Sequence, residues 1–340
     1  MLLMLIIALI MACLSDIAFA GEWTKKADMP TGRVLFGIGI LDGNEIYTVG
    51  GTGNGFLMSQ ITEVFNIKEN KWSKISNSNV ARYAHSVESV NGKIYAIGGI
   101  NNANFWMNTI EEYDPIADKW SFKKNIPSGF GFGASATIDS KIYIIGGWSN
   151  FVSSNQLLVY DPANDNWDKK KNLPANNDGG AACAINGKIY FMGGSDIGGG
   201  GMAPVTTVWE YDIKSDTWVQ KTNMPIARAG HCLVASKGKI YAIGGWSPIG
   251  ALDIVHIYDP VIDKWLEEEI KMTTSRTWFG SVVLKTGEVV ITGGSKNFDG
   301  WAFPPQNLLN LTEIFTPDGN NFGVTSRDKL PTTWGNLRSH

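Results

Sequence analysis

Short segments of alternating hydrophobic and polar residues, separated by turns rich in glycine and asparagine, run through most of the chain. One of them, Lys-Ile-Tyr-Ala-Ile-Gly-Gly, stands at residues 93–99 and again at 239–245. Alternation over such short stretches is typical of half-buried β-strands, and no stretch after residue 20 has sustained helical periodicity. The pattern therefore predicts an all-β protein.

The segments are organised as a repeat, which a Gly-Gly pair marks at intervals of about fifty residues. The pairs stand at 50–51, 98–99, 146–147, 193–194, 244–245 and 293–294. After each pair comes a predicted third strand ending in an aromatic residue: Phe65, Tyr113, Tyr160, Tyr211, Tyr258 and Phe315. A further aromatic residue then opens a fourth strand: Trp72, Trp120, Trp167, Trp218, Trp265 and Phe322.

Four short strands per unit, repeated in register, are typical of a β-propeller in which each sheet is one blade. The Gly-Gly pair, the Tyr-Asp-Pro sequence and the spaced Trp residues resemble the kelch motif and cover nearly all of the chain after residue 20. The resemblance implies a six-bladed kelch-type β-propeller with four antiparallel strands per blade, formed by residues 21–340 as one domain. Because blades bury each other's faces, we interpret the repeated phrase as scaffold.

A ring of blades has to be closed, and the chain offers two ways of closing it. The segment 21–30 contains Trp23 and reads like 217–225, so seven segments of the fourth-strand type serve six blades. The resemblance suggests that one terminus completes the last blade. We favour the strand around Trp23 as the outer strand of blade six, and the segment around Phe322 is the alternative.

The N-terminus differs in kind from the rest of the chain. Residues 1–14 are an unbroken hydrophobic run, and Ala18-Phe19-Ala20 has the small-x-small pattern of a signal-peptidase site. We expect a signal peptide over residues 1–20, cleavage after Ala20, and a secreted or periplasmic product without a membrane-inserted segment. A lipoprotein cleavage at Cys13 is the alternative.

Charge and cysteine content narrow the classes of partner. The formal net charge is −3, and Lys and Arg are interspersed with acidic residues rather than gathered in a basic run. This distribution argues against nucleic-acid binding. Cys183 and Cys232 fall in different repeats, either as two small buried residues or as a single disulfide. We expect a monomer.

The segments leading into the innermost strands carry a candidate anion site. In an up-and-down blade these segments share a face with the loops that follow Gly-Gly. Four of the six have Arg at one matched place, and Phe130 and Asn177 replace it in the other two. The four are Arg33, Arg82, Arg228 and Arg276. A ring of guanidinium groups at a channel mouth would attract a carboxylate; alternatively, each Arg bonds loop carbonyls or pairs with an acid such as Asp178.

The loops after Gly-Gly carry aromatic residues among Asn, Ser and Gly, a composition typical of surfaces that bind sugars and peptides. Trp148 and Trp246 come directly after Gly-Gly, where packing at the blade edge is an equal alternative. Three aromatic residues lie deeper in their loops and are the better ligand candidates: Trp106, Trp301 and Phe303.

The sequence assigns no catalytic residue, metal or cofactor. It has no Gly-x-Ser-x-Gly or His-Glu-x-x-His motif. His85 and His231 occupy matched places on opposite sides of a six-fold ring, which argues against a shared metal ion. We therefore predict an exported binding module for a protein, peptide or carbohydrate.

The alternative function is an enzyme. Some exported kelch propellers isomerise sialic acid, and the architecture resembles that of bacterial N-acetylneuraminate epimerase. The arginines would suit such a sugar acid, and Asp178 is the nearest candidate for a general base.

Overall fold

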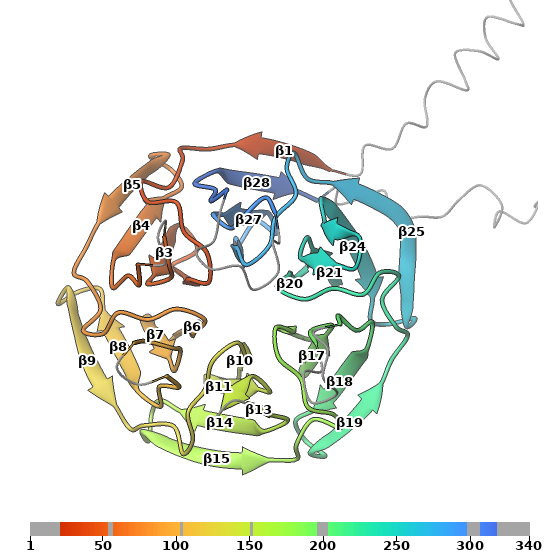
Figure 1. Cartoon of the computed structure of the whole chain (residues 1–340), viewed down its shortest axis with the longest axis horizontal. Coiled ribbons are helices and arrows are strands. Elements are labelled where there is room, and N and C mark those ends of the chain that lie inside the picture. Colours follow the sequence, from red (N-terminus) through yellow and green to blue (C-terminus); the bar gives the residue numbers. More distant parts are fainter. Residues whose placement is uncertain are drawn as a thin grey trace, which may run out of the picture.

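The computed structural model describes residues 21–53, 57–102, 105–149, 152–195, 203–297 and 307–317. In these ranges the strands form six four-stranded antiparallel sheets, arranged as blades around a common centre (Figure 1). The described ranges contain no helix with the length and apolar character needed to cross a membrane. The predicted all-β, six-bladed propeller is confirmed.

The first three blades follow one another along the chain. Blade 1 is β2 (Gly37–Leu41), β3 (Glu45–Val49), β4 (Thr62–Asn66) and β5 (Lys71–Lys74). Blade 2 is β6 (Ser86–Val90), β7 (Lys93–Ile97), β8 (Ile110–Asp114) and β9 (Lys119–Lys123). Blade 3 is β10 (Ala134–Ile138), β11 (Lys141–Ile145), β14 (Leu157–Asp161) and β15 (Asn166–Lys170). Its Gly-Gly loop contains a hairpin, β12 (Trp148–Ser149) and β13 (Val152–Ser153).

The other three blades complete the ring. Blade 4 is β16 (Ala181–Ile185), β17 (Lys188–Met192), β18 (Val208–Asp212) and β19 (Thr217–Gln220). Blade 5 is β20 (Cys232–Ser236), β21 (Lys239–Ile243), β24 (Ile254–Asp259) and β25 (Lys264–Lys271), with the hairpin β22 (Trp246–Ser247) and β23 (Gly250–Ala251) in its Gly-Gly loop. Blade 6 is β26 (Gly280–Val283), β27 (Val289–Thr292), β28 (Thr312–Thr316) and β1 (Glu22–Lys25).

The ring is closed by the N-terminal strand, as the sequence predicts. β1 pairs antiparallel with β28, with Trp23 opposite Phe315, and lies outside β28 in Figure 1. The rings of these two residues are 5.1 Å apart, the same separation as Phe65 and Trp72 in blade 1. The alternative closing residue, Phe322, lies outside the described residues.

A repeated clamp joins each of blades 2–5 to the blade before it and explains the Tyr of the Tyr-Asp-Pro signature and the Trp of the fourth strand. In blade 3, the Asp165 carboxylate accepts hydrogen bonds from the Tyr160 hydroxyl at 2.6 Å and from the Lys124 backbone N–H of blade 2 at 2.9 Å. Trp167 Nε1 donates to the Lys124 carbonyl at 3.1 Å. The same Tyr–Asp pairing to the preceding blade recurs at Asp118, Asp216 and Asp263.

The apolar core lies between neighbouring blades. One cluster combines Tyr95 and Ile97 of blade 2 with Ile142 and Tyr160 of blade 3. Cys183 and Cys232 are free thiols in blades 4 and 5, so the single-disulfide alternative does not apply to this structure.

The Gly-Gly pairs need glycine because the backbone is left-handed there and neighbouring chain comes close. Gly98 and Gly99 have φ of 63° and 99°. A Cβ added to Gly98 would lie 2.5 Å from the Phe130 carbonyl oxygen of blade 3. The phrase is therefore scaffold, where successive blades touch.

Candidate functional site

The four matched arginines lie inside the blades rather than at the channel mouth. Each guanidinium group is fully buried and donates a hydrogen bond to the carbonyl of the first glycine of its own Gly-Gly pair. Asn177, which replaces Arg in blade 4, makes the matching bond to Gly193 at 2.8 Å. This place in the repeat therefore anchors the Gly-Gly turn.

In each of the four blades that have this Arg, the third strand supplies the partner of the guanidinium. Arg33 pairs with Glu63 at 2.7 Å, Arg82 pairs with Glu111 at 2.6 Å, and Arg276 pairs with Glu313. Arg228 instead hydrogen-bonds His256 Nδ1. Burial lowers the pKa of Arg228 to about 10.

An anionic ligand cannot reach these guanidinium groups while the blades hold this conformation. The alternative that the sequence left open, hydrogen bonds to carbonyls and pairing with acids, describes what the arginines do. Asp178 is also buried, and its carboxylate accepts hydrogen bonds from the Ser153 and Ser195 hydroxyls, both at 2.7 Å. The arginines therefore lend no support to the sugar-acid alternative.

Two residues after the Arg place, six backbone groups form a closed ring around the channel mouth. At each of these places the N–H donates to the carbonyl of its counterpart in the preceding blade, over 2.8–3.1 Å. All six have φ between 52° and 64°. They are Leu35, Ala84, Phe132, Gly179, Gly230 and Trp278. Non-glycine residues in this region are strained, so the closed hydrogen-bond ring has to hold them there.

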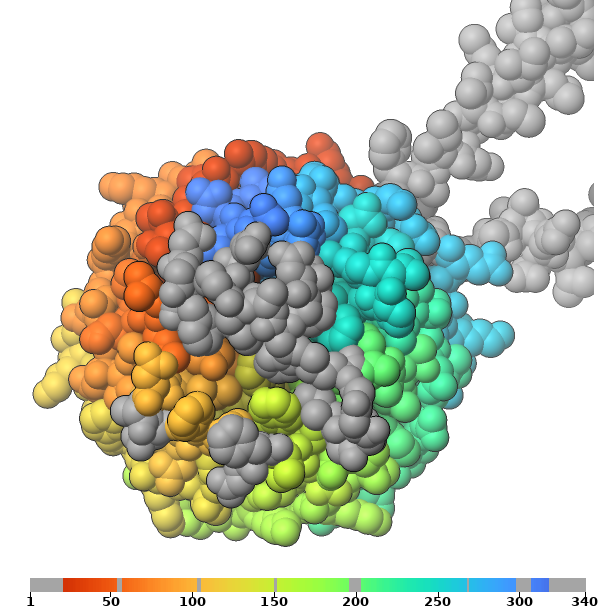
Figure 2. Space-filling model, viewed as in Figure 1, coloured from red at the N-terminus to blue at the C-terminus, as the bar shows by residue number. Residues whose placement is uncertain are grey.

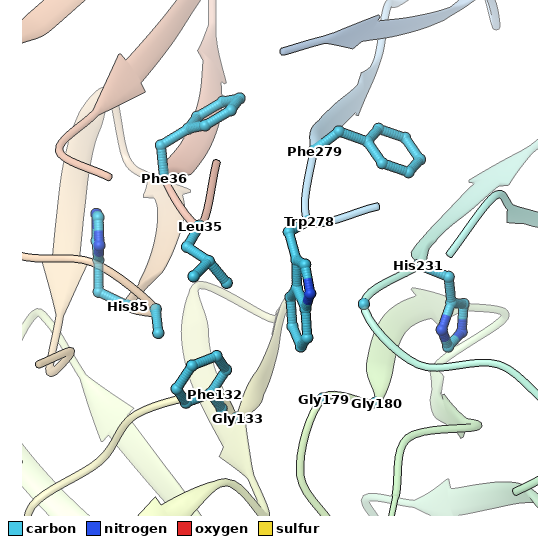
Figure 3. A pocket seen from close by; sticks show the side chains of 12 residues that line it. Leu35, Phe36, His85, Phe132, Gly133, Gly179, Gly180, His231, Trp278 and Phe279 are labelled. Atoms are coloured by element: carbon cyan, nitrogen blue, oxygen red, sulfur yellow. The ribbon is translucent and has the colours of Figure 1, made fainter. Parts of the chain in front are cut away.

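The side chains of this ring fill the mouth unevenly, as Figure 3 shows. Leu35, Phe132 and Trp278 point into a pocket of about 110 Å³. The Trp278 indole lies over Gly179 and Gly230 of the ring, and a Cβ on Gly230 would lie only 2.7 Å from it. The Phe132 and Trp278 rings are 5.4 Å apart, edge to face. Phe132 and Trp278 were in the matched segments but were not predicted as site residues, because only their left-handed backbone turns them toward the axis.

His85 and His231 flank this pocket on opposite sides, as predicted, with Leu35, Phe132 and Trp278 between them (Figure 3). Both imidazoles are buried, and no described residue offers their nitrogens a hydrogen bond of ordinary geometry. Burial holds both pKa values well below the usual range; Arg82 and Arg33 add to this for His85, and Arg228 adds to it for His231, while a backbone contact with Val49 opposes it for His85. No three His, Cys, Asp or Glu side chains of the described ranges could share a metal ion.

Aromatic rings connect the channel mouth to the outer loops of blades 2 and 3. Ring centroids are 5.8 Å apart for Phe105 and Trp106, 6.1 Å for Trp106 and Trp148, and 6.2 Å for Trp148 and Phe132. Trp106 also lines a cleft of about 390 Å³ beside Pro127. The other two predicted aromatic ligands, Trp301 and Phe303, lie outside the described residues.

The loops after Gly-Gly also expose large apolar side chains. Leu57, Phe105, Val152 and Ile249, from blades 1, 2, 3 and 5, are 74%, 61%, 63% and 82% exposed. The blades follow one another around the face in sequence order (Figure 2), so these side chains are spread around the ring. We call the surface formed by these loops the loop face.

Comparison with known proteins identifies the family. A model described as the Attractin/LZTR1 beta-propeller matches residues 24–249, more than half of the chain. The chain belongs to this propeller family. The solved structure of YjhT superposes with a TM-score of 0.71 over 85% of this chain and 96% of that chain, at 15% identity, which shows a shared fold.

Curated relatives carry the kelch name. Kelch repeat and BTB domain-containing protein 12 of Homo sapiens is 27% identical over 122 residues, which are 33% of this chain and 19% of that protein. Kelch-like protein 23 of Homo sapiens is 38% identical over 60 residues, which are 18% of this chain and 11% of that protein. The chain thus matches a minor part of each relative's length. These matches fit a kelch-type propeller.

Proposed function

We propose that this chain is an exported module that binds another protein through the loop face. The proposal rests on the exposed apolar side chains in the loops that follow Gly-Gly. Four blades each expose one of them: Leu57, Phe105, Val152 and Ile249. Exposed apolar side chains surrounded by polar loop residues are typical of protein interfaces. The kelch relatives support a protein partner over a free sugar.

The binding energy should come from a few anchors on this face. Phe105 is the best candidate because its exposed ring stacks on Trp106, which in turn contacts Trp148. An aromatic ring held in place by neighbours loses little entropy on binding. Export is part of the proposal and rests on residues 1–20.

Affinity capture from the extracellular or envelope fraction of the source organism tests the proposal, with the chain from Gly21 as bait. Phe105→Asp and Ile249→Asp should lose the partner. Ile116→Asp and Val261→Asp are matched controls, because these side chains are 94% and 78% exposed but lie in the turns between third and fourth strands, on the opposite face. A partner held equally by all four variants would contradict the proposal, as would binding only to a glycan array.

A further inference from the structure

Glu88, on the innermost strand of blade 2, is an acidic residue at a place where the other repeats have no charge. It lies three residues after His85 of the channel mouth. The matched residues of the other five innermost strands are small or apolar: Gly39, Ala136, Cys183, Val234 and Val282. Five blades form the same innermost strand without a carboxylate at this place, so the propeller fold does not require Glu88.

Glu88 lines the central channel, a space of about 430 Å³ between the six innermost strands, and its carboxylate is hydrogen-bonded to blade 3. It accepts hydrogen bonds from the Ser135 hydroxyl at 2.6 Å and the Thr137 hydroxyl at 2.7 Å, both on β10. Desolvation raises the pKa of Glu88, and the two hydroxyl donors oppose this shift. No Lys, Arg or His of the described ranges forms an ion pair with it.

The two hydroxyl donors favour the ionised form of Glu88, whereas desolvation, the larger effect, raises its pKa and disfavours that form. An ionised carboxylate in a confined space is normally paired with a cation. Described side chains do not provide that cation, so a ligand in the channel would. A metal ion is a poor match, because the described ranges hold no group of three acidic, His or Cys ligands.

The rest of the channel wall indicates the kind of cation. Ile38, Leu233 and Val282 line the space with aliphatic side chains, and Ser89, Ser135 and Ser281 line it with hydroxyl groups. One carboxylate on a wall of aliphatic and hydroxyl side chains suits a single positive charge on an apolar stem, because the hydroxyl groups can accept hydrogen bonds that the carboxylate does not. We propose that the channel binds a primary ammonium group on an aliphatic chain, which donates hydrogen bonds to Glu88.

The ammonium would enter from the face opposite the loop face. On the loop face the ring of Leu35, Phe132 and Trp278 narrows the mouth. This site is therefore separate from the proposed protein-binding surface. The ammonium group could belong to either of two ligands: a free alkylamine or the lysine side chain of a partner segment.

The test is titration calorimetry of the chain from Gly21 with n-butylammonium, and separately with a capped Gly-Lys-Gly peptide, at constant ionic strength. At least one probe should bind, and Glu88→Gln should weaken it at least about tenfold, since a hydrogen bond to a charged group is lost. Tighter binding of n-butylammonium identifies a free amine as the source, and tighter binding of the peptide identifies a lysine side chain. Glu112→Gln is the matched control, because Glu112 bonds Tyr95 and Lys123 outside the channel lining and should leave binding unchanged.

A second measurement keeps the proposal testable if Glu88→Gln folds poorly. In the unaltered chain, the carboxyl carbon of Glu88 followed by NMR should titrate at lower pH when the bound probe is present, because a nearby ammonium stabilises the carboxylate. Equal binding by Glu88→Gln, no binding of either probe, or an unchanged titration midpoint would each overturn the proposal.

Discussion

At the residue scale, the buried arginines show what the sequence could and could not reveal. Their matched spacing was visible, but spacing does not tell whether a side chain turns outward or back into its blade. An overlooked signal lies two residues before the third-strand aromatic: Glu63, Glu111, His256 and Glu313 accompany Arg, whereas Leu158 accompanies Phe130 and Trp209 accompanies Asn177. Residues that vary together across repeats of one chain indicate contact.

Arg228 is the exception among the four, because its partner is a neutral imidazole rather than a carboxylate. Burial lowers the pKa of His256 to about 4, and Arg228 adds to that shift. His256→Glu should supply the missing ion pair and raise the free energy of unfolding by about 1–3 kcal/mol at pH 7. Urea denaturation measures the change, and Glu111→His is the converse control, which should destabilise blade 2. A destabilised His256→Glu would contradict this account of the Arg place.

The three buried histidines make the propeller sensitive to acid. Their folded-state pKa values lie below the ordinary value of 6.5, so the unfolded chain binds protons first as the pH falls. The stability they contribute is complete above pH 6.5 and declines below it; for His256 alone the loss reaches up to about 3 kcal/mol near pH 4.

His85→Phe should reduce this acid sensitivity. Phe36 occupies the matched place in blade 1, where Gly280 makes room for its ring, and Gly37 stands at the same position next to His85. The variant should therefore fold, and its unfolding free energy should change less between pH 7.5 and pH 5 than that of the unaltered chain. An unchanged pH dependence would argue against a buried neutral His85.

At the element scale, the sequence specified the strands and their order well, because each signature residue performs a fixed task between blades. The Tyr–Asp clamp and the indole bond of the fourth strand are local features that spacing reveals. The channel-mouth ring was not predictable in this way, because the left-handed backbone of Leu35, Phe132 and Trp278 depends on hydrogen bonds from the neighbouring blade.

Trp120→Ala tests the clamp. The indole is buried, packs against the Tyr113 ring with the centroids 5.1 Å apart, and donates a hydrogen bond to the Ser76 carbonyl of blade 1 at 3.0 Å. Its loss should lower the free energy of unfolding by roughly 3–5 kcal/mol. Trp167→Ala, at a more exposed indole with the same bond, should cost less. Equal stability of Trp120→Ala and the unaltered chain would refute the role of Trp in joining blades.

At the scale of the whole molecule, the ring depends on the pairing of its two ends. The sequence offered two closing segments, and the choice of β1 over Phe322 depended on contacts between residues almost 300 positions apart, which no local pattern contains.

Removing residues 21–26 tests this closure. It should leave the β28 edge unpaired, remove the Trp23 ring that packs on Phe315, and destabilise the propeller by several kcal/mol. Truncation after Pro317 keeps all four strands of blade 6 and is the control. Similar melting temperatures for the two truncations, measured by differential scanning calorimetry, would contradict closure by β1.

The central claim is that recognition belongs to the loop face while the arginines hold the blades together. Hydrogen–deuterium exchange of the chain, alone and with its captured protein partner, tests this most directly. The account predicts slower exchange on binding in residues 57–60, 105–109 and 246–253. Protection confined to the turns at 114–119 and 259–264, on the opposite face, would contradict it.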